Sequence, residues 1–263
     1  MNNERFVRFS TEKSILSRFG VIREGALSVL NFAPWEGGSE TGERLNVQEI
    51  RLLAPVTPSK IVCVGLNYHA HVSASFSADK PPDTPLIFLK PPSSVIGPKE
   101  SIVHPEQSER VDYEAELGIV IGKLARFVSE ETALDHIFGF TCVNDVTARD
   151  LQKKDGQWGR AKGFDTFCPV GPWIIPRDDI DFANAQVEGI LNDNVMQSGN
   201  TSQMIFSIPT IICYISSVMT LEPGDLIATG TPSGIAPMKP GDTIVVRIAG
   251  IGELSNTMVA QSH

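Results

Sequence analysis

The chain has 263 residues, of which 41% are hydrophobic and 20% are charged, a composition typical of an ordinary soluble globular protein. This length is enough for one large domain with a small extension. The formal net charge is −9, and no run of Lys and Arg stands out. Because phosphate binding needs clustered positive charge, this balance argues against a nucleic-acid partner.

The cysteine pattern and the apolar segments indicate a protein of the cytoplasm. The four cysteines lie in apolar runs without C-x-x-C spacing, so we expect reduced core residues and no zinc site. The N-terminus lacks the apolar stretch of a secretory signal. The most apolar segment, residues 204–219, contains Ser, Thr and Pro and is too short and polar to span a membrane.

The first 54 residues predict a small β-rich region. Short strands separated by turns are expected at residues 6–10, 19–25 and 26–32. A polar, Gly-rich loop follows over residues 33–43. Two prolines in "APVTPSK" mark a boundary, so residues 55–263 are expected to form a second, larger domain.

The larger region alternates apolar strands with few helices. Strands are expected at residues 60–68, 85–92, 112–122, 137–145, 169–176, 222–234 and 239–248. A short helix capped by Ser129 and helices over residues 145–154 and 207–219 are expected between them, the last with Ser207 as its cap. Residues 69–85 predict a short helix and a mobile loop. Because regular βαβ alternation is missing, the fold class is α+β, mainly β.

Two glutamates in "VDYEAELGIVIGK" are the strongest sign of a functional site. Glu114 and Glu116 stand two residues apart, so both side chains point to the same face of the predicted strand. Two carboxylates on an otherwise apolar strand face are costly unless a cation lies between them. Asp145 ends the apolar run "GFTCVND" and adds a third carboxylate. Three oxygen ligands without His or Cys favour a hard divalent cation such as Mg²⁺ or Mn²⁺.

Other polar residues follow buried strands in the sequence. His69 and His71 come directly after the strand at residues 60–68, where a solvated loop is the simpler interpretation. Lys162 and Arg149 lie downstream of Asp145 and are suited to an anionic substrate, although for Arg149 we favour an exposed helix face. "GTPSG", residues 230–234, offers backbone N–H groups to an anion or forms a simple turn. Nucleotide-binding motifs and the G-x-S-x-G serine elbow are missing.

Taken together, six segments resemble the fumarylacetoacetate hydrolase family. They are "VGLNYHAH", "PLIFLKPPSSVIGP", "VDYEAELGIVIGK", "VNDVTARDLQ", "AKGFDTFCPVGPWI" and "GDLIATGTPSG". They occur in the order of the family, and the resemblance runs from about residue 60 to the C-terminus. It implies a mixed β-roll with a smaller N-terminal region, usually assembled as a homodimer.

The resemblance also implies roles for individual residues. Glu114, Glu116 and Asp145 match the carboxylates that hold Mg²⁺, sometimes Mn²⁺ or Ca²⁺. Lys162 matches a lysine that stabilises enolate or carboxylate charge, and His71 matches a histidine in a lid over the substrate. Contacts with the substrate are expected from Gln152, Thr231, Lys90 and Gly230.

One departure from the family affects the expected reaction. Relatives that hydrolyse or decarboxylate often carry Glu three residues after the lid histidine, where this chain has Ala74; Asp79 is a possible substitute. This departure bears on the activation of water and leaves metal binding and enolate stabilisation untouched. From the resemblance we expect a metal-dependent enzyme that forms an enolate from a small 2-oxo or 2,4-dioxo acid, with His71 as general acid and base. C–C cleavage of oxaloacetate or an acylpyruvate is the first hypothesis. Oxaloacetate tautomerisation or 2-hydroxyhepta-2,4-diene-1,7-dioate isomerisation is the second, and a non-catalytic binding homologue is the third.

Overall fold

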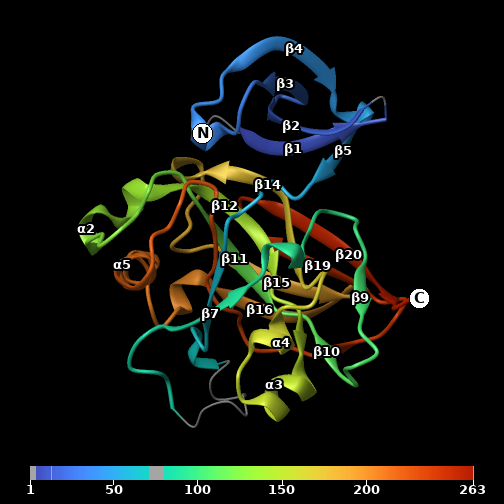
Figure 1. The fold of residues 1–263 in the computed structure, drawn as a ribbon, viewed down its shortest axis with the longest axis vertical. Coiled ribbons are helices and arrows are strands. Elements are labelled where there is room, and N and C mark those ends of the chain that lie inside the picture. The colour runs from blue at the N-terminus through green and yellow to red at the C-terminus, as the bar shows by residue number, and fades with distance from the viewer. Residues whose placement is uncertain (1–3, 13, 71–79, 263) are drawn as a thin grey trace.

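The computed structural model describes residues 4–12, 14–70 and 80–262 and is built mainly from β-strands (Figure 1). Twelve strands form one large sheet. Those of its N-terminal part are β1 (Arg5–Thr11), β2 (Ser14–Arg23), β3 (Ala26–Leu30), β4 (Glu40–Asn46) and β5 (Ile50–Leu53). The others are β6 (Ile61–Gly65), β7 (Leu86–Lys90), β8 (Val95–Ile96), β11 (Ala115–Ile121), β12 (Ile137–Asn144), β14 (Cys168–Pro176) and β17 (Leu226–Ala228). The prediction of an α+β, mainly β fold is confirmed.

Two smaller sheets complete the strand structure. The first contains β16 (Asn194–Asn200), β15 (Gln186–Leu191), β19 (Thr243–Ile248), β20 (Gly252–Ala260) and β9 (Ile102–His104), in that order. The second contains β13 (Thr147–Ala148), β10 (Val111–Asp112) and β18 (Pro237–Met238). Apolar side chains from the large sheet and the five-stranded sheet pack into a shared core, in which Leu117, Cys142 and Val246 are fully or almost fully buried.

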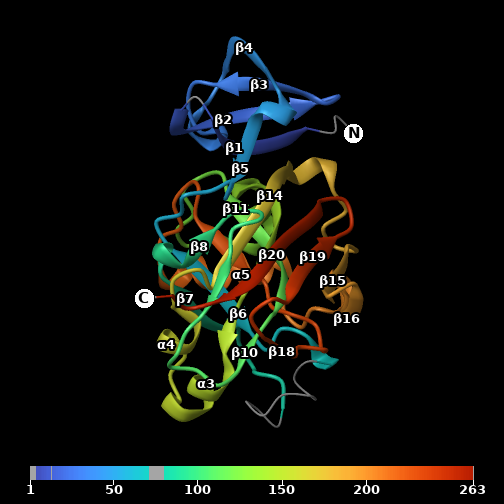
Figure 2. The ribbon, with the colours of Figure 1, turned by 90° about the vertical axis from the view of Figure 1, so that its right-hand side faces the viewer.

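The N-terminal strands lie at one end of the molecule (Figures 1 and 2). They continue the large sheet, because β1 pairs antiparallel with β14 through Phe6 and Ile174. They also enclose a small apolar cluster of their own, which includes Val7, Phe9 and Leu27. The domain division at residues 54 and 55 stays a prediction.

The helices are short and few among the described residues. They are α2 (Glu130–Ala133), α3 (Arg149–Asp155), α4 (Gly159–Lys162) and α5 (Ile208–Val218). As predicted, Ser207 caps α5 by accepting a hydrogen bond from the Thr210 amide at 3.3 Å. Ser129 precedes α2, but its side chain makes no capping hydrogen bond. None of the helices in the described ranges has the length and apolar character needed to cross a membrane.

One predicted helix starts later than the sequence pattern suggests. Thr147 and Ala148 form strand β13, because they pair with Asp112 and Val111 of β10. Helix α3 begins only at Arg149. This start places the first turn of α3 directly beside β10 and the strand end that carries Glu114.

Candidate metal centre and substrate cavity

Three carboxylates meet where β11 and β12 lie side by side. Glu114 directly precedes β11, Glu116 is its second residue, and Asp145 directly follows β12. The ends of these strands are in register, and the Asp145 amide donates to the Glu114 carbonyl at 2.9 Å. Each of the three residues offers a carboxylate oxygen, and these oxygens all lie within 4.8 Å of one another. The structure thus brings the three predicted metal ligands together, and all three are buried.

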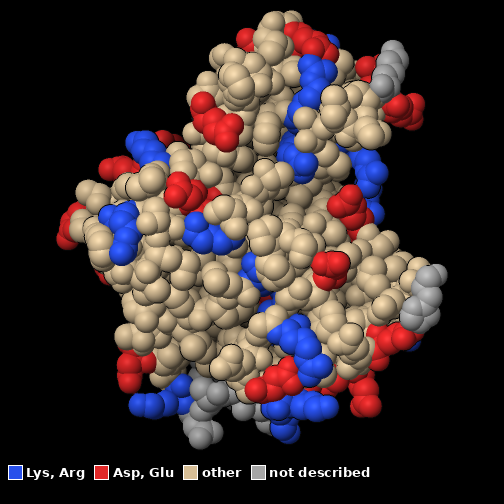
Figure 3. Space-filling model, in the orientation of Figure 1, with Lys and Arg blue, Asp and Glu red and all other residues tan. Residues whose placement is uncertain are grey.

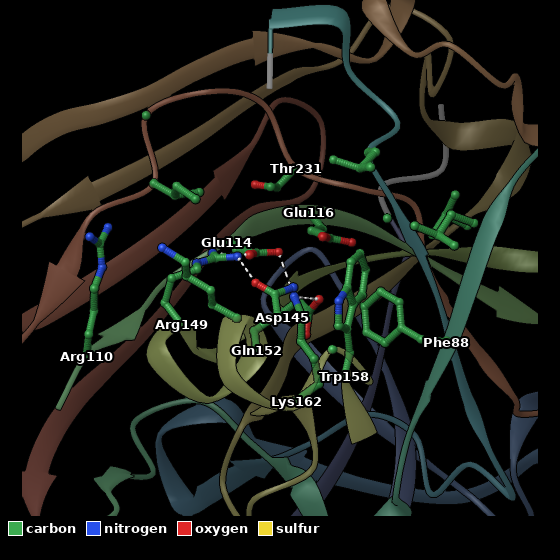
Figure 4. Close-up of a pocket in the computed structure, with 18 residues that line it drawn as sticks. Phe88, Arg110, Glu114, Glu116, Asp145, Arg149, Gln152, Trp158, Lys162 and Thr231 are labelled. Atoms are coloured by element: carbon green, nitrogen blue, oxygen red, sulfur yellow. Dashed lines mark hydrogen bonds and ion pairs between the residues drawn. The ribbon is translucent and has the colours of Figure 1, made fainter. Parts of the chain in front are cut away.

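Three cations neutralise this cluster. Lys162 Nζ donates to Glu114 Oε2 at 2.9 Å and to Asp145 Oδ2 at 2.5 Å. The Arg149 guanidinium pairs with Glu114 (Figure 4). Lys90 Nζ donates to Asp145 Oδ1 at 2.5 Å. Burial alone would lower the pKa of Lys162, but the Asp145 and Glu114 carboxylates raise it above its ordinary value. The two carboxylates therefore favour the charged form of Lys162.

Glu116 provides the structural test of whether a metal fits here. Its Oε2 accepts a hydrogen bond from the Gly230 amide at 2.8 Å. Burial, together with the nearby Asp145 and Glu114 carboxylates, raises the pKa of Glu116 well above its ordinary value. A divalent cation would remove this penalty, since it offers positive charge to all three carboxylates at once. The donor set, made only of carboxylate oxygens, fits a hard ion such as Mg²⁺ or Mn²⁺.

A loop after β17 closes one side of the site. Gly230 has φ 100° and an added Cβ would lie 2.7 Å from the Asn67 Cβ, so only glycine fits there. Thr231 Oγ1 donates to the Ala115 carbonyl at 2.9 Å, between the two glutamates. Tyr113 anchors the end of the same loop, because its hydroxyl donates to the Gly234 carbonyl at 3.0 Å.

Arg149 corrects one sequence-based interpretation. We expected it on an exposed helix face, but its side chain is only 21% exposed. It donates to Asp112 Oδ2 at 2.9 Å and to Gln152 Oε1 at 2.6 Å, in addition to its ion pair with Glu114. The expectation was wrong because β10 and β13 pair immediately before α3, so the first helical residue faces the carboxylates.

The carboxylates open into a cavity of about 760 Å³. Its described lining includes Glu114, Glu116, Asp145, Arg149, Gln152, Lys162 and Thr231, together with Leu86, Phe88, Trp158, Arg110 and Lys153. Phe88 and Trp158 pack edge to face with their ring centroids 5.1 Å apart and form an aromatic wall. In Figure 4 this wall lies on one side of the carboxylates, and Arg110 and Arg149 lie on the other.

The remaining predicted residues differ in their relation to the cavity. Lys90 and Gly230 do not line it, and they contact Asp145 and Glu116 instead. His71, the predicted general acid and base, lies outside the described residues, as do Ala74 and Asp79.

Gln197 is a structural part of the site that sequence reasoning missed. It is fully buried on β16, where its Oε1 accepts from the Ala115 amide at 2.9 Å. Its Nε2 donates to Thr231 Oγ1 at 2.8 Å and to the Pro232 carbonyl at 2.7 Å. Gln197 thus ties the strand between the two glutamates to the Thr231 loop. A polar residue within "NVMQSGN" carried no local signal of this role.

Two family models match this chain. The model described as fumarylacetoacetate (FAA) hydrolase C-terminal matches residues 60–259, and the model described as Rv2993c-like, N-terminal, matches residues 4–55. A relative from Bacillus subtilis, named oxaloacetate tautomerase YisK, is 44% identical over 222 residues, which cover 80% of this chain and 74% of that protein.

Solved structures share the whole fold. The structure described as 2-hydroxyhepta-2,4-diene-1,7-dioate isomerase from Mycobacterium marinum has a TM-score of 0.90 and 41% sequence identity, and the match covers 99% of this chain and 100% of that one. Maleylpyruvate hydrolase from Sphingobium sp. SYK-6, in complex with manganese(II) and pyruvate, has a TM-score of 0.80 and 32% identity, covering 98% and 100%. The chain belongs to the fumarylacetoacetate hydrolase family.

Proposed function

We propose that this protein is a divalent-metal-dependent enzyme that catalyses keto–enol tautomerisation of oxaloacetate or a closely similar 2-oxo acid. The observation that carries the proposal is Lys162, a buried lysine whose ammonium group donates to two carboxylates of the candidate metal centre. This arrangement places positive charge where it can stabilise a negatively charged intermediate. Enolate formation needs such stabilisation, because negative charge develops on the 2-oxo oxygen.

Glu114, Glu116 and Asp145 are proposed to hold Mg²⁺, with Mn²⁺ as the alternative. When bound, the ion supplies a Lewis acid that stabilises charge on the enolate oxygen. Lys162 adds a second positive charge in a partly desolvated site, where its effect is larger than in water. Thr231 and Gln152, both in the cavity lining, are proposed to orient the substrate. The proton transfer is assigned to His71 on the sequence resemblance alone.

The names of similar proteins support tautomerisation over cleavage. The relative named as an oxaloacetate tautomerase is 44% identical, whereas two neighbours named as hydrolases are 37% and 32% identical. Hydrolytic cleavage also needs a group that activates water. In the described part of the cavity lining, the only carboxylates are Glu114, Glu116 and Asp145, which hydrogen bonds and ion pairs already engage. Ala74 at the position of the usual lid glutamate adds to this argument.

C–C cleavage remains a second candidate, supported by the maleylpyruvate hydrolase neighbour with bound pyruvate. An enolate of pyruvate is the immediate product of such cleavage, so the same charge-stabilising groups would serve both reactions. For either activity we propose a homodimer, as the family resemblance implies, and a location in the cytoplasm, as the cysteine pattern indicates.

The test adds the enol form of oxaloacetate to the protein with Mg²⁺. Loss of the enol is followed by its ultraviolet absorbance, and pyruvate release is measured in parallel. A sample with Mg²⁺ and no protein is the control. We expect faster loss of the enol without pyruvate above the control. Lys162→Met should slow the reaction by about 10²–10³-fold. Pyruvate release above the control would instead establish cleavage. No acceleration of either reaction, in protein that binds Mg²⁺, would favour a non-catalytic homologue.

A further inference from the structure

Two cations at the cavity take no part in the carboxylate cluster. Arg110 directly precedes β10, and Lys153 lies on α3, next to Gln152. Both line the cavity, and both are solvent-accessible, with the Arg110 side chain 47% exposed. Figure 3 shows several Lys and Arg side chains over α3 and α4, although the whole chain has a net charge of −9. Arg110 and Lys153 therefore bring two positive charges to the cavity lining of a negatively charged protein.

Asp112 holds the outer guanidinium beside the inner one. Arg110 Nε donates to Asp112 Oδ1 at 2.9 Å, and its Nη2 donates to Oδ2 at 3.2 Å. Arg149 Nε donates to the same Oδ2 and continues inward to Glu114. Three successive ion pairs, Arg110–Asp112, Asp112–Arg149 and Arg149–Glu114, thus connect Arg110 to the candidate metal ligand. Its orientation is set by a fully buried carboxylate, so the guanidinium is preorganised.

Both outer cations keep donors available for a ligand. Nη1 of Arg110 has no partner within the described ranges, and neither has the Lys153 ammonium group. By contrast, Nε, Nη1 and Nη2 of Arg149 all contact protein groups, namely Asp112, Gln152 and Glu114. Each nitrogen of the inner arginine therefore has a protein partner, whereas the outer pair lines the cavity with nitrogens that have no partner in the described ranges. Phe88, Trp158 and Leu86 add apolar surface to the same cavity.

We propose that Arg110 and Lys153 form a subsite for the second carboxylate of a dicarboxylic substrate. The inference rests on the proposed function, because it assumes that the 2-oxo acid end of the substrate binds at Glu114, Glu116 and Asp145. A planar guanidinium and a flexible ammonium group match a carboxylate that arrives from the cavity mouth. The subsite selects dianions over monoanions of the same length.

The test compares two hydroxy acids that cannot enolise and have equal carbon counts. Malate carries the second carboxylate, and 2-hydroxybutyrate has a methyl group instead. Binding of each to the Mg²⁺-loaded, full-length protein is measured by calorimetry, so the result does not depend on turnover. We expect malate to bind about fivefold to tenfold more tightly, as an exposed but preorganised ion pair allows. Because the subsite is solvated, this preference should shrink as salt is added.

The adjacent lysine on the same helix is the matched control. Lys154 carries the same charge and is exposed, but it does not line the cavity. Lys153→Ala should remove most of the malate preference and leave 2-hydroxybutyrate unchanged, whereas Lys154→Ala should preserve the preference. Arg110→Gln should act like Lys153→Ala and tests the second half of the subsite.

Three results would overturn the subsite: equal affinities of the two acids in the unmodified protein, failure of malate to bind, or equal effects of the two lysine substitutions. The proposed function fails separately. A protein that prefers malate through Lys153 yet does not accelerate enol loss has the subsite without the tautomerase activity.

Discussion

Glu116 differs from the other two carboxylates in its partners. Lys162, Lys90 and Arg149 contact Glu114 or Asp145, whereas the hydrogen-bond partner of Glu116 is the Gly230 amide. We predict that Glu116→Gln stabilises the metal-free protein by about 1 kcal/mol, because a neutral isostere avoids the cost of burying a charge beside two carboxylates. The same change should weaken Mg²⁺ binding by more than about a hundredfold, since a direct ligand is lost. Urea unfolding and calorimetry measure the two effects.

Glu109→Gln is the control for Glu116→Gln, because Glu109 is exposed and does not line the cavity. It should change neither unfolding nor Mg²⁺ affinity. If Glu116→Gln keeps full Mg²⁺ affinity, Glu116 is not a ligand.

Gln197 supports the site without touching the cavity. Gln197→Met keeps the length of the side chain but leaves the buried Ala115 amide without its acceptor. We predict a loss of about 1–3 kcal/mol in the free energy of unfolding, the cost of an unsatisfied buried donor. Gln186→Met is the matched control, because the Gln186 side chain makes an exposed hydrogen bond to Ser198, and we expect a change below about 0.5 kcal/mol. Equal urea midpoints for the two variants would contradict the role of Gln197.

At the residue scale, local spacing was enough to predict that the acidic residues lie together. It was not enough to predict which side chains surround them. Glu114 and Glu116 share a strand face whatever the rest of the fold does, so their proximity follows from the sequence. Arg149 was misread because its direction depends on a tertiary pairing between β10 and β13. Gln197 was missed because its partners lie 34 to 82 residues away.

Among the elements, strands β17 and β19 each follow a turn with the same Pro-Gly-Asp sequence. Pro-Gly-Asp precedes β17 and also β19, and in each turn the Asp amide donates to the carbonyl of the residue three positions earlier, at 3.0 Å. Gly224 and Gly241 have φ of 87° and 97°, which matches the third position of a type II turn. Each Asp carboxylate then accepts the amide of the first turn residue.

Gly241→Ala isolates the backbone cost of such a turn. A Cβ at Gly241 would meet no atom within 4 Å, so the positive φ is the source of any destabilisation. We predict a loss of about 1 kcal/mol, measured by thermal unfolding. Gly159→Ala is the matched control, because Gly159 also has open space around it but begins helix α4 without a positive φ. If Gly159→Ala destabilises the protein as much as Gly241→Ala does, the turn geometry is not the cause.

Long elements were predictable and very short ones were not. The strands around residues 61–65, 115–121 and 137–144, and helix α5, carry apolar patterns long enough to be recognised. Strands β10, β13 and β18 have two residues each and exist only because they pair with one another. A local sequence pattern cannot reveal such pairs, because the paired segments are far apart in the sequence and are brought together only by the tertiary fold.

For the whole molecule, the candidate metal centre lies at the adjoining ends of β11 and β12, two central strands of the large sheet. An ion that binds the folded chain and not the unfolded chain stabilises the entire fold by mass action. We predict that Mg²⁺ at about 100 times its dissociation constant adds about 2.7 kcal/mol to the free energy of unfolding. Addition of a chelator should reverse this gain, as shown by thermal unfolding. Glu116→Gln should show no such response, and an equal response in that variant would place the ion elsewhere.

The positive side chains around the three carboxylates bear on whether the chain folds before or after it binds a metal ion. Lys90, Lys162 and Arg149 already pair with Asp145 and Glu114 in the folded chain. Since these pairs come from the polypeptide itself, we expect newly synthesised chains to reach the native state before they acquire an ion. Loading then becomes a separate, reversible event after folding. The identity of the resident ion would therefore follow the free ion concentrations in the cell and the selectivity of the carboxylates, instead of being fixed during synthesis.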